Sequence, residues 1–186
     1  MALRCGWLLI GLLLLTGCSD RKHKDTQNQV SQESTAPAPN LPKTWEFSDQ
    51  NSQSMRFERT PGGLKIQPAP NAPVLLAFLG LEPKFVPYSA LLNHLASSFK
   101  TVRFVGVLDR PYAPKQVQHY VKAYTPKFTL LNPITDLSSL SVFLQTDTWK
   151  MPYFLLYNKE GVLQQSYRGA IVEEMLTKDI QDLLQR

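Results

Sequence analysis

Cysteine is the side chain with the widest range of chemistry, and this chain has two, Cys5 and Cys18. Both lie near the N-terminus, so the sequence after Cys18 contains no thiol. A disulfide framework or a cysteine-based zinc site needs several cysteines within the folded part of a protein. The sequence therefore excludes both from the body of the chain.

The residues around Cys18 have the pattern of a bacterial lipoprotein signal. Arg4 supplies a positive charge, residues 7–15 are apolar, and the segment LTGC that ends at Cys18 resembles a lipobox. We expect a signal peptide over residues 1–17 and a thioether between the Cys18 thiol and diacylglycerol. The mature chain would then have no free thiol. The alternative is an uncleaved apolar anchor followed by an unmodified cysteine.

Other side chains capable of chemistry lack partners at suitable spacings. His94 and His119 have no carboxylate at a metal-ligand spacing beside them, so we expect solvated or partly packed histidines. Glu82, near a predicted helix start, could act as an acid or base, but a single carboxylate is weak evidence for catalysis. Glu173 and Glu174 open a predicted helix and compensate its dipole. We predict no catalytic residue, no metal and no cofactor.

Composition and charge define a tether followed by one domain. The chain has 186 residues, of which 43% are hydrophobic and 19% charged, a balance typical of globular proteins. Residues 18–43 comprise the lipidated cysteine and a polar segment that we expect to be a flexible tether, and residues 44–186 form the domain. The basic run at residues 21–24 either touches anionic headgroups or is simply solvated. The other basic residues are scattered, so we expect no basic cluster and no nucleic-acid binding.

Hydrophobic periodicity predicts that strands and helices alternate. Apolar residues at every second position near Trp45 and Met55 predict a short hairpin, and Gly62-Gly63 predicts a turn. Beyond the turn we expect strands at residues 74–79, 102–108, 128–131, 153–157 and 162–167, and helices at residues 91–99, 114–124, 136–144 and 171–184. This order predicts an α/β fold in which helices flank a mixed central sheet.

Four segments carry a resemblance to a known family: VLLAFLGLEPKF (74–85), LLNHLASSFK (91–100), VRFVGVLDR (102–110) and KMPYFLLYNKEGVLQQSYRGAI (150–171). They are similar to the family's strand and active-site loop, its leucine-rich helix, its second core strand, and its cis-proline strand with a glycine hairpin. On these segments, residues 45–186 resemble the membrane-anchored thioredoxin-like thiol–disulfide oxidoreductases of the TlpA and ResA type. The resemblance implies a thioredoxin-like fold and a cis peptide bond between Met151 and Pro152.

The cysteines of that family are absent. The family has Trp-Cys-x-x-Cys after its first core strand, often with proline after the first cysteine. Alignment on Pro83 places the two cysteine positions at Glu82 and Phe85, and counting from the strand places them at Pro83 and Val86. Disulfide exchange needs an activated thiolate and a second thiol. If Cys18 is lipidated, the mature domain cannot perform it, nor act as a cysteine-dependent peroxidase or as a cysteine-based copper chaperone.

The resemblance also implies a binding groove. In this family the residue before the cis proline, here Met151, binds an extended peptide through its backbone. Tyr88, Trp149 and Tyr153, together with Phe85, flank that position in the sequence and would line an apolar groove. The alternative is that some of these aromatic residues belong to the core.

Three functions remain open at this point. The first is a cell-envelope lipoprotein that binds a protein or peptide through the groove without catalysis. The second is an accessory that presents substrates to an envelope oxidoreductase, and the third is a non-redox enzyme that uses Glu82. Ser19, after the lipidated position, favours the outer membrane facing the periplasm. The expected partners are the membrane, through the lipid, and an envelope protein or peptide.

Overall fold

The computed structural model describes residues 40–68, 71–145 and 151–185. The strands are β1 (Thr44–Asp49), β2 (Ser54–Thr60), β3 (Gly63–Gln67), β4 (Val74–Leu79), β5 (Arg103–Leu108), β6 (Thr129–Pro133), β7 (Tyr153–Tyr157) and β8 (Leu163–Arg168). The helices are η1 (Pro83–Phe85, a 3-10 turn), α1 (Val86–Ser98), α2 (Pro114–Tyr124), α3 (Ser138–Phe143) and α4 (Glu173–Leu184). Within these described ranges, no helix has both the length and the hydropathy needed to cross a membrane.

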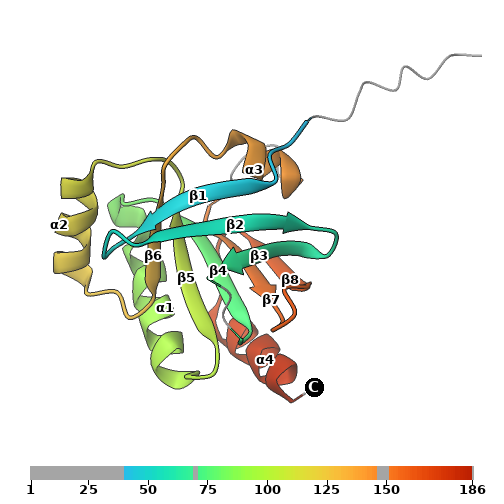
Figure 1. Ribbon diagram of the computed structural model, residues 1–186. Helices are drawn as coiled ribbons and strands as arrows, with labels where there is room; N and C mark the ends of the chain where they lie inside the picture. The colour runs from blue at the N-terminus through green and yellow to red at the C-terminus, as the bar shows by residue number, and fades with distance from the viewer. Residues whose placement is uncertain (1–39, 69–70, 146–150, 186) are drawn as a thin grey trace, which may run out of the picture. The chain divides into compact units, whose positions relative to one another are not determined.

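All eight of these strands form one sheet in the order β3-β2-β1-β6-β5-β4-β7-β8 (Figure 1). The central strands β4, β5 and β6 run parallel, as expected where helices connect successive strands. β7 pairs antiparallel with β4, and β1 pairs antiparallel with β6. The predicted α/β architecture, a mixed sheet flanked by helices, is confirmed.

β4 is buried on both faces and separates two hydrophobic cores. All six of its residues are buried. Because side chains alternate along a strand, Leu75, Ala77 and Leu79 enter the core beneath α1, α2 and α4. Leu76 and Phe78 enter the second core, to which α3 contributes. The helices therefore hold the sheet from both sides.

The first strands form a three-stranded meander rather than the predicted hairpin alone. β1 and β2 pair antiparallel as expected, and the chain then turns at Gly62-Gly63 into β3, which pairs with β2. Leu64 and Ile66 of β3 are buried, and Lys65 between them is exposed. Two apolar residues in so short a strand give too brief an alternation to be distinguished from a loop.

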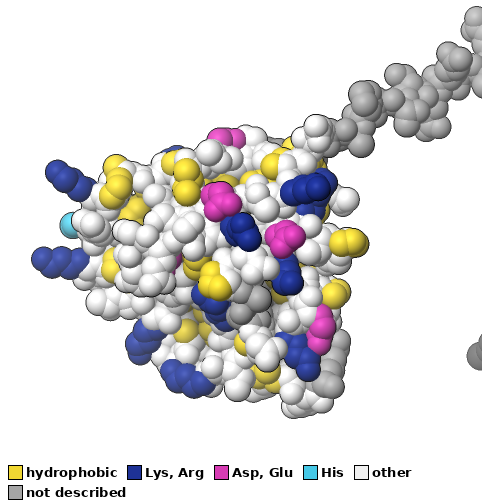
Figure 2. Space-filling view, in the orientation of Figure 1, with side chains coloured by type: hydrophobic (Ala, Val, Ile, Leu, Met, Phe, Trp, Pro, Cys, Tyr) yellow, Lys and Arg dark blue, Asp and Glu magenta, His cyan; other side chains and the backbone are white. Residues whose placement is uncertain are grey.

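The exposed basic residues are less scattered than the sequence suggested. α1 and α2 contain no Asp or Glu, whereas α4 contains four acidic residues and one lysine. Figure 2 shows Lys and Arg side chains projecting from the side of the domain that α2 forms. The prediction of no basic cluster is wrong, because lysines far apart in the sequence come together when α2 packs beside α1.

We expect Gly106→Ala, in the centre of β5, to destabilise the fold. A Cβ at this position would lie 2.7 Å from Cε2 of Phe128, whose ring is itself buried. Ring or backbone must then move, which costs about 1–3 kcal/mol in the free energy of unfolding. Urea denaturation of the full chain in detergent measures this cost.

The matched control for this prediction is Gly62→Ala. Its Cβ would meet no atom closer than 3.5 Å, an ordinary contact distance. We expect a change of less than about 0.5 kcal/mol. Equal losses of stability in the two variants would contradict the packing argument for Gly106.

Candidate functional site

Polar groups from three segments meet at one edge of the sheet, the one formed by the carboxyl ends of β4 and β5. β4 leads into residues 80–85, β5 leads into residues 109–113, and β7 begins after Met151-Pro152. β4 and β5 are parallel and β7 is antiparallel to them, so the ends of the first two and the start of the third lie together. Loops at the carboxyl ends of parallel strands are the usual location of binding sites in α/β sheets.

Glu82 lies at the start of a helix, as expected, although the helical turns begin at Pro83 and Val86, before the predicted residue 91. It is the N-cap residue of η1, and its backbone carbonyl accepts a hydrogen bond from the Phe85 N–H at 2.9 Å. Its carboxylate makes no capping bond. Instead, Oε1 accepts a hydrogen bond from Nη2 of Arg110 at 3.0 Å, in an ion pair whose two side chains are 39% and 58% exposed.

The second carboxylate oxygen of Glu82 is enclosed by the chain. Oε2 is buried and has no hydrogen-bond partner within the described part of the chain. It lies so close to Gly80 that a Cβ there would collide with it, and the Phe85 ring is the next neighbour. Gly80 therefore lets the carboxylate fold back over the backbone, which orients Oε1 toward Arg110.

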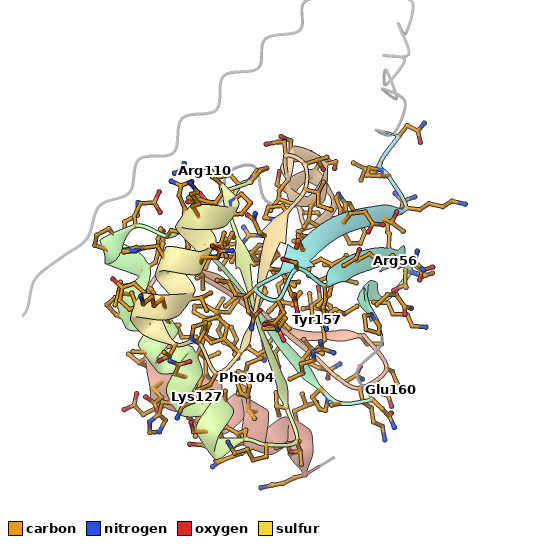
Figure 3. The ribbon with its side chains drawn as sticks, turned by 60° about the vertical axis from the view of Figure 1, so that its left-hand side comes forward. Arg56, Phe104, Arg110, Lys127, Tyr157 and Glu160 are labelled. Atoms are coloured by element: carbon orange, nitrogen blue, oxygen red, sulfur yellow. The ribbon has the colours of Figure 1, made fainter. Side chains whose placement is uncertain are left out.

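Arg110 belongs to a connected polar cluster on the β5 side of the site. Its guanidinium carbon lies 5.0 Å from the centroid of the Tyr112 ring. The Tyr112 hydroxyl donates to Oδ1 of Asp109 at 2.9 Å and accepts from the Leu81 N–H at 3.4 Å. Figure 3 shows Arg110 at the end of α2 on this edge. The cluster thus ties the loop after β5 to the loop after β4.

The contacts of Tyr112 and Arg110 determine the protonation states of these two side chains. Burial, followed by the hydrogen bond to Asp109, raises the pKa of Tyr112 to about 12, so its hydroxyl stays protonated at neutral pH. The neighbouring Tyr112 and Asp109 raise the pKa of Arg110, which stays cationic. The cluster therefore offers a fixed guanidinium at the rim of the site.

Asn132 holds the loop after β5 in place. Its Oδ1 accepts from the Tyr112 N–H at 2.9 Å, and its Nδ2 donates to the Tyr112 carbonyl at 2.9 Å. Sequence reasoning missed Asp109, Arg110, Tyr112 and Asn132. The available signal was the Asp-Arg pair directly after a buried parallel strand, at the end where sites form.

Phe85 does not present a reactive or binding group. Its side chain is 3% exposed and packs in the core beneath α1. In the alternative alignment the corresponding positions are Pro83 and Val86, which have no titratable group. In either alignment, Glu82 is the residue of the 82–86 segment that brings a carboxylate to the site.

Tyr88 and Tyr153, two of the side chains proposed for the aromatic groove, do not lie together. Tyr153 is 3% exposed and lies in the second core, stacked on Phe78 with ring centroids 5.9 Å apart. Tyr88 is half-buried against Phe154, on the opposite face of the sheet. Alternation along β7 directs residues 153 and 154 to opposite faces, so these two tyrosines cannot line one groove. Trp149 lies outside the described residues.

The Met151–Pro152 peptide bond is cis, in agreement with the resemblance. The Pro152 carbonyl accepts a hydrogen bond from the Gly169 N–H at 2.8 Å, which links the start of β7 to the end of β8. Met151 is half-buried against the core beneath α1. A second cis bond, Gln67–Pro68, was not predicted.

His94 pairs with a carboxylate of another helix, and His119 lines a surface pocket with Leu81, the neighbour of Glu82. Nε2 of His94 lies 3.2 Å from Oε1 of Glu173, and the His94 side chain is 64% exposed. The sequence showed no carboxylate beside His94 because Glu173 arrives from α4, and Glu173 and Glu174 do open that helix as predicted. His119 is exposed on α2. In the described part of the chain, no three His, Cys, Asp or Glu residues form a group that could hold a metal.

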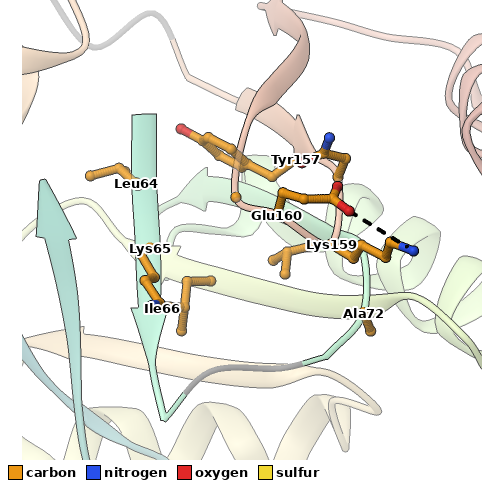
Figure 4. Close-up of a pocket in the computed structure, with 10 residues that line it drawn as sticks. Leu64, Lys65, Ile66, Ala72, Tyr157, Lys159 and Glu160 are labelled. Carbon is orange, nitrogen blue, oxygen red and sulfur yellow. Dashed lines mark ion pairs between the residues drawn. The ribbon is translucent and has the colours of Figure 1, made fainter. Parts of the chain in front are cut away.

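A separate small pocket lies at the opposite edge, where β4 begins and β7 ends (Figure 4). Leu64, Ile66 and Val74 line it together with the turn after β7, and Lys159 and Glu160 form an ion pair of 3.9 Å at its rim. Tyr157 lies beside it with a buried hydroxyl that has no partner among the described residues, and burial raises its pKa. The pocket does not adjoin the Glu82 site, since the length of β4 separates them.

Comparison with known proteins supports the architecture. No protein-family model matches the chain, and no curated protein matches its sequence. Among solved structures, the chain is similar to a secreted disulfide oxidoreductase of Mycobacterium tuberculosis, with a TM-score of 0.55 and 18% identity over 75% of this chain and 96% of that one. The chain is also similar to a thiol-disulfide oxidoreductase of Bacteroides fragilis. The TM-score is 0.56, and the identity is 17% over 77% of this chain and 98% of that one.

A third solved structure, a thioredoxin-like protein of Porphyromonas gingivalis, gives a TM-score of 0.57 and 12% identity over 78% of this chain and 92% of that one. The chain therefore has a thioredoxin-like fold. At such low identity the similarity concerns the fold alone, and the activity must be argued from the site.

From the contacts of Tyr112 in the polar cluster, we predict that its hydroxyl ionises in a late step of the alkaline titration of the full chain, above the pH at which ordinary tyrosines ionise. The pKa of Tyr112 in the folded state, about 12, lies above the ordinary value of 10.0. The neutral hydroxyl therefore stabilises the fold below pH 10, and this contribution is lost as the pH rises to about 12. Tyr120, Tyr157 and Tyr167 also have raised pKa values.

Tyr112→Phe separates the contribution of this residue from the others. In a rapid pH jump monitored by tyrosinate absorbance before unfolding, the variant should lose one tyrosine equivalent from the late step. The step near pH 10 should keep its amplitude. A loss from the early step instead would show that Tyr112 is not held by Asp109 and Leu81.

Proposed function

We propose that this chain is a cell-envelope lipoprotein whose thioredoxin-like domain binds a protein segment at the Glu82–Arg110 site without disulfide exchange. The observation that carries the proposal is the ion pair itself. Glu82 and Arg110 stand at the edge where the loops after β4 and β5 meet the cis-proline loop. In the alignment on Pro83, the resemblance to oxidoreductases places the first cysteine at Glu82, and in the other alignment at the next residue.

Disulfide exchange is incompatible with the residues at the site. The reaction needs a thiolate and a resolving thiol, and no cysteine follows Cys18 in the sequence. Lipid attachment at Cys18 would consume the remaining thiol of the mature chain. The domain therefore has the fold of an oxidoreductase with a carboxylate and a guanidinium where sulfur chemistry would occur.

The Glu82–Arg110 pair is better suited to binding a partner than to stabilising the fold. Exposed ion pairs contribute little to folding, about 0–1 kcal/mol. The same charged groups form charge-assisted hydrogen bonds to a bound chain that are roughly twice as strong as neutral ones. Arg110 can donate to a carbonyl or carboxylate oxygen of the partner, and Glu82 can accept a hydrogen bond from an N–H. The pair thus presents both a donor and an acceptor to an extended segment.

Met151 supplies the second element of recognition. In proteins that this chain resembles, the residue before the cis proline pairs with an extended peptide through its backbone, a form of strand addition. Met151 is only half-buried, and it precedes β7 at the edge where Glu82 follows β4. Backbone pairing at Met151 with charged contacts at Glu82 replaces the aromatic groove as the mode of binding.

The same site accommodates the accessory function, in which the bound segment is a substrate of an envelope oxidoreductase. A non-redox enzyme is less consistent with the geometry. Within the described residues, the Glu82 carboxylate is bonded to Arg110, which stays cationic, and the nearby Tyr112 hydroxyl stays protonated. Neither neighbour can exchange a proton with substrate at neutral pH. The lipobox and Ser19 support a location at the outer membrane, facing the periplasm.

Site-specific photo-crosslinking in the native cell envelope tests the proposal. Lys84 is exposed and lies two residues from Glu82, so a photoreactive residue at position 84 of the full chain should capture the partner. Glu82→Gln keeps the size of the side chain but removes its charge. We expect the yield of the adduct to fall about tenfold or more, as expected for loss of a charge-assisted bond at an interface.

Asp182→Asn is the matched control, because it removes the carboxylate of another exposed ion pair, with Lys178 on α4. It should leave the adduct unchanged, as should complete alkylation of thiols before irradiation. The proposal fails if Glu82→Gln crosslinks as well as the parent chain. It fails equally if alkylation abolishes the adduct, since that would restore a role for a cysteine.

A further inference from the structure

The outer face of α2 carries a continuous stripe of basic side chains. Lys115, His119 and Lys122 are spaced by four and three residues, so they lie on one side of the helix, and all three are exposed. Lys127 follows the helix, and Lys100 follows the neighbouring α1. We call these five residues the α2 face.

The charge of this part of the chain is strongly one-sided. Residues 83–135 contain seven Lys or Arg and a single acidic residue, Asp109, whose carboxylate is hydrogen-bonded to Tyr112. Figure 3 shows Lys127 by α2 on one side of the domain, whereas Arg56 and Glu160 lie on the other side, where charges of both signs occur. The α2 face therefore has a local positive potential that the net charge of the chain does not reveal.

The lysines of the α2 face are not neutralised within the domain. Nζ of Lys127 donates to Oγ of Ser97 at 3.1 Å, and Nζ of Lys100 donates to the Ala96 carbonyl at 3.1 Å. Over the part of the chain that the structure describes, no ion pair joins a carboxylate to the four lysines of this face. These charges remain available to an anionic partner.

We propose that the α2 face docks on a phospholipid bilayer that contains anionic headgroups. Several phosphates on one surface complement a stripe of lysines, each of which strengthens binding about fivefold near an anionic membrane. Tyr124, at the end of α2, is 38% exposed, and tyrosine favours the level of the headgroups. An acidic protein would need an apolar centre to its interface, and the exposed residues of α2 are mostly polar.

The length of chain before the domain favours the same occupant. Residues 19–43 can span at most about 90 Å, and a domain of this length has a radius of gyration of about 15 Å. If Cys18 is lipidated, any face of the domain can reach the bilayer, so the anchor alone does not choose one. The anchor raises the local concentration of lipid, and the charge of the α2 face then selects the orientation.

Docking in this orientation goes beyond the proposed function; it shares the lipid anchor with that proposal but not the binding of a protein segment at Glu82 and Arg110. α2 begins four residues after Arg110, so the docked helix would hold the Glu82–Arg110 site near the headgroups. The domain would then bind its partner segment close to the membrane surface. The lipid contact itself needs neither Glu82 nor a protein partner, so the two proposals can fail separately.

Hydrogen–deuterium exchange of the full chain reconstituted in vesicles tests this docking. One set of vesicles is phosphatidylcholine alone, and the other contains one third phosphatidylglycerol. The chain is held in both by its N-terminus, so a difference reports the contact of the domain. We expect uptake over residues 111–127 to fall severalfold on the anionic vesicles and uptake over α4 to stay the same. The protection should vanish at about 1 M salt, where the Debye length is about 3 Å.

The triple variant Lys115→Glu, Lys122→Glu and Lys127→Glu should abolish the protection. A matched control reverses three exposed charges elsewhere, Arg56→Glu, Lys65→Glu and Lys159→Glu, and should keep it. Equal uptake on the two kinds of vesicle, or protection that survives the α2 reversal, overturns the proposal. Protection of residues 111–127 by native envelope protein but not by anionic vesicles would also overturn it and would identify an acidic protein as the occupant.

Discussion

The burial of β4 on both faces is the constraint on which the rest of this structure depends. A strand whose six residues are all buried must be covered by helices on each side and paired along both edges. β5 satisfies one edge in parallel, and β7 satisfies the other in antiparallel orientation. This arrangement brings the loop that follows β4 next to the loop that precedes β7, so that Glu82 and Met151 share one edge of the sheet.

The chemistry at that edge depends on how the chain positions one carboxylate. Gly80 leaves room for Glu82 to fold back, and Asn132 fixes the Tyr112 backbone through two hydrogen bonds, which sets the position of Arg110. The result is an ion pair at the same edge as the cis proline, in a fold shared with known oxidoreductases. A fold does not determine its activity, and our proposal of recognition at this site rests on its charged groups.

Charge is distributed unevenly over the domain. α1 and α2 contain no acidic residue, whereas α4 contains four. A charge asymmetry of this kind does not stabilise a fold, but it orients a protein near a charged surface. Combined with the proposed lipid anchor, it would give the domain a preferred face toward the bilayer and would place the Glu82–Arg110 site beside it.

The sequence showed that no cysteine follows Cys18. Local patterns also predicted the α/β architecture, the helices, and every strand of the domain except β3. Each of these depends on local patterning: a continuous apolar run for β4, residues spaced four and three apart for α2, and a Gly-containing turn for the β7–β8 hairpin. β3 was not predicted, because two apolar residues are too few to establish a period.

Contacts between residues distant in the sequence come from the tertiary structure. It paired Glu82 with Arg110 across 28 residues and His94 with Glu173 from another helix, and it gathered the lysines of the α2 face. It also placed Tyr153 and Tyr88 on opposite faces of the sheet, so these two side chains do not share the predicted groove. Such contacts depend on strand order and on the direction in which each side chain points. Strand order is settled when the two cores pack together, and local periodicity carries no information about it. Alternation says which side chains share a face of a strand, but not which core that face enters.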